Sequence, residues 1–433
     1  MTDQKTTEDR IDASVSRVLN LRMITGQFDS VADQPYTSIG AEAVNSTQSF
    51  QLNLEAALQS LVLLKNTNQV LPLVRGKKTV LLGPHVHSKR DLMSDYKGDQ
   101  QCVGGDYSCF PSIAEYFTTA NPTSTVVEAG VDMNSTNASG IPAALAAVRN
   151  SAEQVILFIG IGNAQEHEAH DRFNTSLPGL QEPFTLQMLA LCKQLNIPAA
   201  VVLINGGAVA IDPVVPAANA LVEAFYPSVR GAQALNMALF GDANANRFGR
   251  LPVTLYNKKY IEQVDFHNFE MSKPPGRTYK YYTGQPLFEF GQGLSYSRFG
   301  LQCSIAAGIA SGASNATTVH RITCVVDNLS ELDGDEVLMV YHTVSNDIRK
   351  QVKHPVPLRA LVGFDRLSVG AHSSKEATSF EIGENQLGLV DEHGDLQLIA
   401  GVHTVCISNG NTNQHSFNIT VKESKVLDVV PRF

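Results

Sequence analysis

The chain has 433 residues, of which 43% are hydrophobic and 17% are charged, a composition that is ordinary for a globular protein of two or three domains. It carries 33 Lys and Arg residues against 42 Asp and Glu residues, a formal net charge of −9, without any long basic run, so we expect no nucleic-acid partner and no anionic membrane partner. No apolar run approaches the roughly 18 residues that a membrane-spanning helix needs, so we expect no membrane span.

The first fifty residues are predicted to hold one amphipathic helix and a linker. Apolar residues recur at spacings of three and four between residues 8 and 28, and Gly26 is placed to end this helix. A single helix has no core of its own, and the polar segment 31–50 offers it no partner. A second and stronger helical pattern follows at residues 52–65.

From residue 79 onward, short apolar strands alternate with helical segments. Strands are expected at residues 79–84, 125–127, 155–159, 199–204 and 221–225, and helices at 111–120, 140–149, 182–195 and 231–240. This alternation predicts an α/β sandwich domain, in which a mainly parallel sheet has helices on both faces.

After residue 299 the helical periodicity disappears and β-type patterns replace it. Short runs of this kind, separated by turn residues, occur at 321–328, 336–344, 359–364, 379–382, 396–399, 404–408 and 416–421. Seven short strands at this spacing predict an all-β sandwich of immunoglobulin type.

The buried strand at residues 155–159 leads directly into a charged loop. Gly160 lets the backbone turn, and Glu166 and Glu168 follow within a few positions. Ligands of open parallel sheets bind at the carboxyl ends of the strands, so these two glutamates are the first candidates for chemistry. Each carboxyl group can also raise the pKa of the other, as a general acid requires. The alternative is a solvated charged turn without a function.

Two further interpretations of this loop have less support. His167 and His170 are three residues apart rather than the four that place two histidines on one helix face, so no metal is expected. Gly160 and Gly162 lack the third glycine and the ribose-binding acid of a dinucleotide site, so no cofactor is expected either.

The cysteines and the glycosylation motifs favour an oxidising compartment. Cys102 and Cys109, seven residues apart in a glycine-rich loop, can close a small disulfide ring, and a pair of inert thiols is the alternative. N-x-[ST] triplets begin at Asn45, Asn134, Asn137, Asn174, Asn315, Asn328 and Asn418. The polar amino terminus has no signal-peptide core, so secretion is expected for a longer protein rather than from this chain as written.

Several motifs in chain order resemble the carboxyl-terminal portion of family 3 glycoside hydrolases, the β-glucosidases and β-xylosidases. Residues 57–66, followed by Leu71-Pro72-Leu73, are similar to the entry to the second domain of that family. Residues 166–172, followed by Leu177-Pro178-Gly179, are similar to its acid/base loop, E-x-E-x-x-D-R. Further similar segments are Tyr226-Pro227, Leu239-Phe240-Gly241-Asp242, residues 249–254, Arg277-Thr278-Tyr279 and residues 290–296.

The resemblance implies a division of the chain into four parts. These are the terminal helix of a (β/α)₈ barrel at residues 1–30, a linker at 31–50, the C-terminal α/β sandwich domain of the family at 51–298 and a fibronectin type III-like domain at 299–433. The barrel carries the nucleophilic aspartate and most of the sugar pocket in this family. We therefore expect no nucleophile in this chain, as in a truncated gene model, a fragment or one half of a split enzyme.

The resemblance also implies a reaction and roles for the loop residues. The expected reaction is the retaining hydrolysis of terminal β-linked glucose or xylose from oligosaccharides, for which Glu168 supplies the acid/base and Glu166 is the alternative. Asp171 and Arg172 are expected to form a salt bridge that braces the loop. Without the barrel the chain is expected to be inactive, and the competing hypothesis is a non-catalytic carbohydrate-binding or scaffolding protein.

Overall fold

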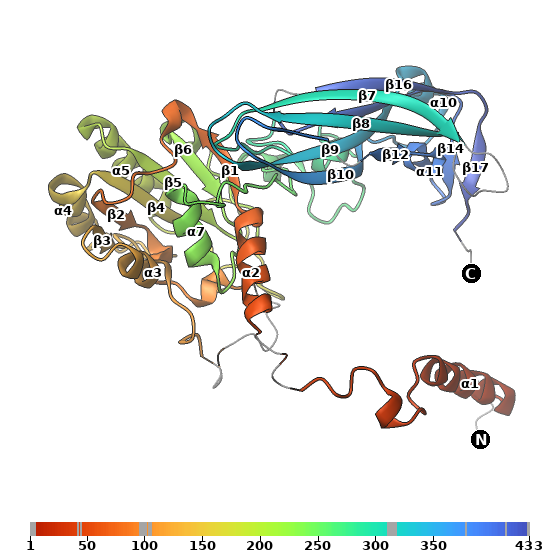
Figure 1. Cartoon of the computed structure of the whole chain (residues 1–433), viewed down its shortest axis with the longest axis horizontal. Helices are drawn as coiled ribbons and strands as arrows, with labels where there is room; N and C mark the ends of the chain where they lie inside the picture. The colour runs from red at the N-terminus through yellow and green to blue at the C-terminus, as the bar shows by residue number, and fades with distance from the viewer. Residues whose placement is uncertain are drawn as a thin grey trace. The chain divides into compact units, whose positions relative to one another are not determined.

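The computed structural model falls into two compact units, Met1–Leu52 and Asn53–Phe433 (Figure 1). It describes residues 6–40, 43, 46–94, 102, 106–309, 318–376, 379–411 and 414–430.

The first unit is built on helix α1 (Glu8–Ile24), which confirms the helix expected there. The side chain of Thr7 caps its amino end by accepting a hydrogen bond from the backbone N–H of Arg10 (3.3 Å). Two residues beyond its end, Gly26 adopts a φ of +72°, which favours glycine. None of the side chains of α1 is buried, so the packing of this unit does not cover its apolar residues.

The second unit begins with a mainly parallel six-stranded sheet in the order β1-β6-β5-β4-β2-β3, in which only β1 is antiparallel to its neighbour. Its strands are β1 (Val62–Asn66), β2 (Thr79–Leu82), β3 (Thr125–Glu128), β4 (Gln154–Gly160), β5 (Ala199–Ile204) and β6 (Ala220–Glu223). Strands β2, β4, β5 and β6 are buried along their whole length, because helices cover both faces of the sheet.

Helices α2, α3 and α7 pack on one face of this sheet and α4 and α5 pack on the other (Figure 1). Their bounds are α2 (Thr47–Ser60), α3 (Ile113–Ala120), α4 (Ile141–Ser151), α5 (Gln181–Leu195) and α7 (Gly231–Leu239). The expected α/β sandwich architecture is thereby confirmed.

The prediction of a helix at residues 52–65 is wrong from residue 61 onward. Helix α2 ends at Ser60, and the apolar residues that follow form strand β1, which pairs antiparallel with β6. Apolar residues on consecutive positions suit a strand covered on both faces as well as a helix, and here pairing with β6 decides the outcome.

The remainder of the second unit consists of antiparallel sheets, as expected for an all-β region. The sheet orders are β10-β9-β15-β16, β11-β8-β12 with β7 also paired to β8, and β13-β14-β17. The strands are β7 (Phe299–Ile309), β8 (Thr318–Asn328), β9 (Gly334–Val344), β10 (Ala360–Val369), β11 (Ser374–Glu376), β12 (Phe380–Ile382), β13 (Leu389–Val390), β14 (Leu396–Leu398), β15 (Gly401–Ser408), β16 (Gln414–Val421) and β17 (Lys425–Asp428). All seven expected runs coincide with strands, whereas β7, β11, β13 and β17 were not expected.

Among its described residues, the second unit also contains five short α-helices and a disulfide between two strands. The short helices are α6 (Val214–Ala217), α8 (Tyr260–Gln263), α9 (Thr278–Tyr281), α10 (Asn346–Gln351) and α11 (Glu384–Leu387). Cys303 and Cys324 face each other across β7 and β8 and form a disulfide. Among the described residues, no helix is both long enough and apolar enough to cross a lipid bilayer.

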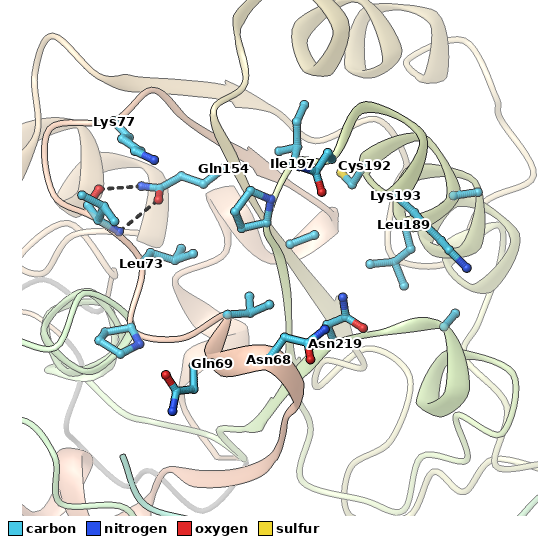
Figure 2. A pocket seen from close by; sticks show the side chains of 18 of the residues that line it. Asn68, Gln69, Leu73, Lys77, Gln154, Leu189, Cys192, Lys193, Ile197 and Asn219 are labelled. Atoms are coloured by element: carbon cyan, nitrogen blue, oxygen red, sulfur yellow. Dashed lines mark hydrogen bonds between the residues drawn. The ribbon is translucent and has the colours of Figure 1, made fainter. Parts of the chain in front are cut away.

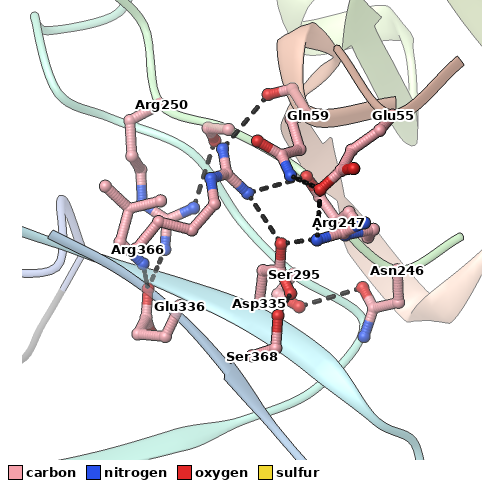
Figure 3. A network of polar contacts seen from close by, with 12 residues as sticks. Glu55, Gln59, Asn246, Arg247, Arg250, Ser295, Asp335, Glu336, Arg366 and Ser368 are labelled. Carbon is pink, nitrogen blue, oxygen red and sulfur yellow. Dashed lines mark hydrogen bonds and ion pairs between the residues drawn. The ribbon is translucent and has the colours of Figure 1, made fainter. Parts of the chain in front are cut away.

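A charged network joins the α/β region to the antiparallel region (Figure 3). Arg250 forms an ion pair with Glu336, and the side chains of both residues are at most 3% exposed. Arg247 and Arg366 both contact Asp335, at 3.1 Å each. The two regions are therefore held together by buried charges as well as by apolar packing.

Replacing Arg250 by Met is expected to lower the free energy of unfolding by about 3–5 kcal/mol, because Glu336 then remains buried without its charged partner. The matched control is Arg321→Met, which removes an ion pair with Glu381 in which both side chains are about 60% exposed, and it is expected to cost less than about 1 kcal/mol. Urea unfolding of the two variants measures both values. Equal losses would contradict a stabilising role for the buried pair.

Strand β6 ends at Glu223, whose side chain is buried at the carboxyl edge of the parallel sheet. Glu223 is 1% exposed, and burial raises its pKa from 4.5 to about 8, so the group is mainly protonated at neutral pH. It accepts a hydrogen bond from the backbone N–H of Phe225 (2.9 Å) and also contacts the side-chain amide of Asn205. The buried Oδ1 atom of Asn205 has no hydrogen-bond partner among the described residues.

Glu223 is expected to make the stability of the chain fall as the pH rises from about 4.5 to about 8. In this window the folded chain still binds the proton, whereas the unfolded chain has released it, so deprotonation favours the unfolded state. Glu223→Gln keeps an acceptor for Phe225 but removes the titration. Between pH 5 and pH 8, the free energy of unfolding of the wild type should therefore fall by a few kcal/mol relative to that of the variant, at about 1.4 kcal/mol per pKa unit. Urea unfolding at the two pH values measures this change. If the free energies of unfolding of wild type and variant changed with pH in the same way, the raised pKa of Glu223 would be contradicted.

Candidate active site

The loop that follows strand β4 is anchored where it leaves the sheet. The carboxylate of Asp91, from the segment after β2, accepts a hydrogen bond from the backbone N–H of Asn163 (3.0 Å). The buried side chain of Asn163 in turn donates to the carbonyl oxygen of Met93 (3.0 Å). Two neighbouring strand ends thus fix the start of the charged loop at the carboxyl edge of the sheet, the place where parallel sheets bind ligands.

Arg172 holds the middle of this loop. Its Nε atom lies 2.7 Å from Oε2 of Glu166, and its guanidinium also donates to the carbonyl oxygens of Ser176 (3.5 Å) and Ala208. The prediction of a salt bridge between Asp171 and Arg172 is wrong, because Arg172 pairs with Glu166 instead. A planar guanidinium can serve one carboxylate and two carbonyl groups at the same time, so a single side chain ties together three parts of the chain.

The backbone after strand β5 comes into direct contact with Glu166. A Cβ atom at Gly207 would lie only 2.3 Å from Oε1 of Glu166, and one at Gly206 would lie 2.2 Å from the ring of Tyr226. These two positions must be glycine for the side chains to pack where they do. Glu166 is therefore enclosed between Arg172 and the turn after β5.

Glu168 occupies a different environment, at the tip of a tight turn. The backbones of His167 and His170 exchange two hydrogen bonds, of 3.2 and 3.0 Å, and their rings stack with centroids 5.1 Å apart. Ala169 completes the turn with a φ of +65°. Glu168 is exposed at this tip, whereas Glu166 is partly buried beside Arg172.

An open cleft of about 500 Å³ lies beside this turn. Its polar lining includes Asn134, Gln165, His170, Asp171, Arg172 and Asn174, and Phe173 stands among them. The structure thus brings Asp171 and Arg172 to the same cleft, although they do not pair with each other. Asp91, which contacts the loop, was not identified from the sequence, and its signal is that it lies within ten residues of the end of a parallel strand. Tyr226, next to the turn after β5, was noted only in the segment Tyr226-Pro227 and not as a site residue.

Cys102 and Cys109 form the small ring considered above, with sulfur atoms 2.01 Å apart. Cys102 packs with Met93 and Phe110 in a separate apolar cluster. Since Met93 also accepts the hydrogen bond from Asn163, the disulfide ring adjoins the segment that anchors the charged loop.

A larger pocket, of about 800 Å³, lies at the opposite, amino-terminal edge of the parallel strands (Figure 2). Gln154 reaches its wall, but its amide is already bonded to the backbone of Val74 and to the hydroxyl of Thr79. Cys192 is also in the wall, and burial raises the pKa of this free thiol to about 12, which makes it unreactive at neutral pH. The residues that line this pocket include Lys77 and Lys193 but no carboxylate and no histidine.

No group of three or more His, Cys, Asp and Glu side chains suited to a metal ion occurs in the part of the chain that the structure describes.

The comparisons with known proteins agree on one family. Residues 61–296 match the family model "Glycosyl hydrolase family 3 C-terminal domain". The exo-1,4-β-xylosidase bxlB of Emericella nidulans is 29% identical over 92% of this chain and 51% of its own length.

Two solved structures share the fold. A family 3 exo-β-xylosidase (XlnD), in complex with a xylobiose aziridine probe, superposes with a TM-score of 0.83 at 27% identity over 100% of this chain and 56% of its own. A β-glucosidase from Listeria innocua, in complex with glucose, gives a TM-score of 0.77 at 21% identity over 99% of this chain and 56% of its own. The chain spans about half the length of the relatives it matches, and it belongs to glycosyl hydrolase family 3.

Proposed function

We propose that this chain supplies the general acid/base, Glu168, of a retaining β-glycosidase that releases terminal glucose or xylose from β-linked oligosaccharides. The nucleophilic aspartate would lie on a barrel domain outside these 433 residues. The observation that carries the proposal is the difference between the environments of the two glutamates in the loop. Arg172 and Gly207 enclose Glu166, whereas the turn between His167 and His170 presents Glu168 outward from the carboxyl edge of the sheet.

The proposed reaction has two steps. The aspartate first attacks the anomeric carbon while the protonated Glu168 gives its proton to the glycosidic oxygen, so that the leaving sugar departs as an alcohol. The carboxylate of Glu168 then takes a proton from the water that attacks the glycosyl–enzyme ester, which releases the sugar and restores the acid. Retention requires the two carboxyl groups to be about 5–5.5 Å apart, so an outward-facing donor suits a nucleophile on another domain.

The proposal includes a fibronectin type III-like identity for the antiparallel region and secretion of the longer protein. Two disulfides support an oxidising compartment. Asn137 and Asn418, which begin N-x-[ST] triplets, are exposed and can accept a glycan. Asn328 begins another triplet but is buried, with its amide bonded to two carbonyl oxygens, so we expect no glycan there. Asn45 and Asn315 lie outside the described residues.

In the enzyme completed by its barrel, Glu168→Gln is expected to slow hydrolysis of an alkyl β-xyloside or β-glucoside by about 10²–10⁴-fold, because the leaving oxygen loses its proton donor. A dinitrophenyl glycoside needs no proton to leave, so its cleavage in the first step should be far less affected. Azide should then accelerate turnover by forming the β-glycosyl azide without a general base.

The matched control is Glu166→Gln. This change removes the partner of Arg172 and should lower activity equally for good and poor leaving groups, without rescue by azide. If Glu166→Gln showed the leaving-group dependence and the azide rescue instead, the acid/base would be Glu166.

The purified 433-residue chain by itself is expected to hydrolyse neither 4-nitrophenyl β-xyloside nor 4-nitrophenyl β-glucoside, because the proposal places the nucleophile on a separate barrel domain. Release of nitrophenol by the chain alone, abolished by Glu168→Gln, would show that a separate aspartate is not needed. The alternative function, a non-catalytic carbohydrate-binding protein, would be supported by sugar binding that persists in a completed protein without any turnover.

A further inference from the structure

We infer that a small pocket beside strand β9 is a binding site for a small phenolic compound, whose hydroxyl group donates a hydrogen bond to Nδ1 of His342. The pocket has a volume of about 170 Å³ and lies in the antiparallel region, among residues of β9, α9 and β13. Its lining residues do not belong to the charged loop after β4, so this inference does not depend on the proposed function.

The surrounding chain decides which nitrogens of two neighbouring histidines carry protons. Nε2 of His403 lies 2.8 Å from the carbonyl oxygen of Ile399, which can only accept, so this nitrogen carries a proton. Nδ1 of a neutral His403 is therefore an acceptor, and Nε2 of His342, which lies 2.9 Å away, must donate to it. The remaining nitrogen, Nδ1 of a neutral His342, then carries a lone pair and no proton.

This lone pair has no partner in the part of the chain that the structure describes. His342 is 3% exposed, and its only hydrogen bond among the described residues is the one between Nε2 and His403. Burial, together with the neighbouring His403 and Arg349, lowers the pKa of His342 to about 3, so the ring stays neutral at ordinary pH. Buried acceptors in folded proteins are usually hydrogen-bonded, and a ligand in the pocket that His342 lines can supply the donor.

The wall of the pocket is held in a fixed shape. The guanidinium of Arg349 donates to the carbonyl oxygens of Val356 (2.9 Å) and Pro357 (2.8 Å). The backbone N–H of Leu358 donates to the carbonyl oxygen of Lys280 (2.6 Å), which ties the same segment to helix α9. A ligand therefore enters a space whose walls are already ordered, which limits the entropy lost on binding.

The rest of the lining is mainly apolar. Its apolar side chains are those of Val344, Val356, Pro357, Ala360, Leu389 and Val390. Lys280, Tyr281 and Thr343 also line the pocket, without any carboxylate, so the lining does not favour a cation. The hydroxyl of Thr343 already donates to the carbonyl oxygen of Leu358 (2.7 Å).

A phenol matches this lining better than a sugar does. A sugar would place most of its hydroxyl groups against apolar side chains, where they have no partners. A phenol has one hydroxyl donor on an apolar ring, and its O–H donates more strongly than that of an alcohol because it is more acidic. An apolar cavity of about 150 Å³ can bind benzene, so a pocket of about 170 Å³ can hold a single aromatic ring.

The test compares the binding of 4-methylphenol to the full chain with that of 4-methylanisole, which has the same ring but no hydroxyl donor. The phenol is expected to bind about 3- to 10-fold more tightly in a calorimetric titration, as one hydrogen bond allows. In NMR spectra of the chain labelled with ¹⁵N in its histidines, the Nδ1 resonance of His342 should move with the phenol and not with the anisole. Absence of saturable binding, or equal binding of the two compounds, would overturn the inference.

Substitutions assign the moving resonance. His342→Phe removes the acceptor and should abolish both the preference for the phenol and the moving resonance. The matched control, His415→Phe, removes a ring outside the pocket, whose Nε2 atom lies 2.9 Å from the carbonyl oxygen of Leu301, and it should change neither. If His342→Phe does not fold, Ala360→Leu, which narrows the pocket and keeps both histidines of the pair, should prevent binding instead. A moving resonance from another histidine, or displacement of the phenol by methyl β-xyloside, would contradict the assignment.

Discussion

The ion pair between Arg172 and Glu166 is the interaction on which the geometry of the loop depends. It links the loop after β4 to the turn after β5, where Gly207 leaves room for the carboxylate. The start of the loop is held by Asp91, whereas the turn around Glu168 is exposed. In the proposed function, Glu166 supports the loop and Glu168 contacts the substrate, although only one residue separates them.

Most of the α/β architecture could be predicted because each buried strand is a continuous apolar run and each helix has its own period. The errors have physical causes. The end of the predicted helix at 52–65 became β1 because an edge position beside β6 was available, which local sequence does not show. Strand β7 was missed because its second half contains small residues such as Ala306, Ala307 and Gly308, which give little apolar alternation, and it is held by pairing with β8 and by the disulfide to Cys324.

The position of the candidate site at the end of β4 could be predicted from the sequence, but the contacts within it could not. The carboxyl edge of β4 followed from the order of strands and helices, and so did the two candidate glutamates. The partner of Arg172 did not follow, because Asp171 and Glu166 are both within reach of a long side chain and only the turn after β5 selects between them. The same limit applies to the buried pair of Arg250 and Glu336, whose members are 86 residues apart and meet only through packing of the two regions.

The most direct test of the central claim is a crystal structure of this chain together with its nucleophile-bearing barrel and an uncleaved xylo-oligosaccharide. The account predicts a carboxyl oxygen of Glu168 about 2.6–3.2 Å from the glycosidic oxygen and about 5–5.5 Å from the carboxyl group of the nucleophile, with Glu166 still bonded to Arg172. A structure in which Glu166 has left Arg172 and occupies that position, while Glu168 points away from the sugar, would contradict it.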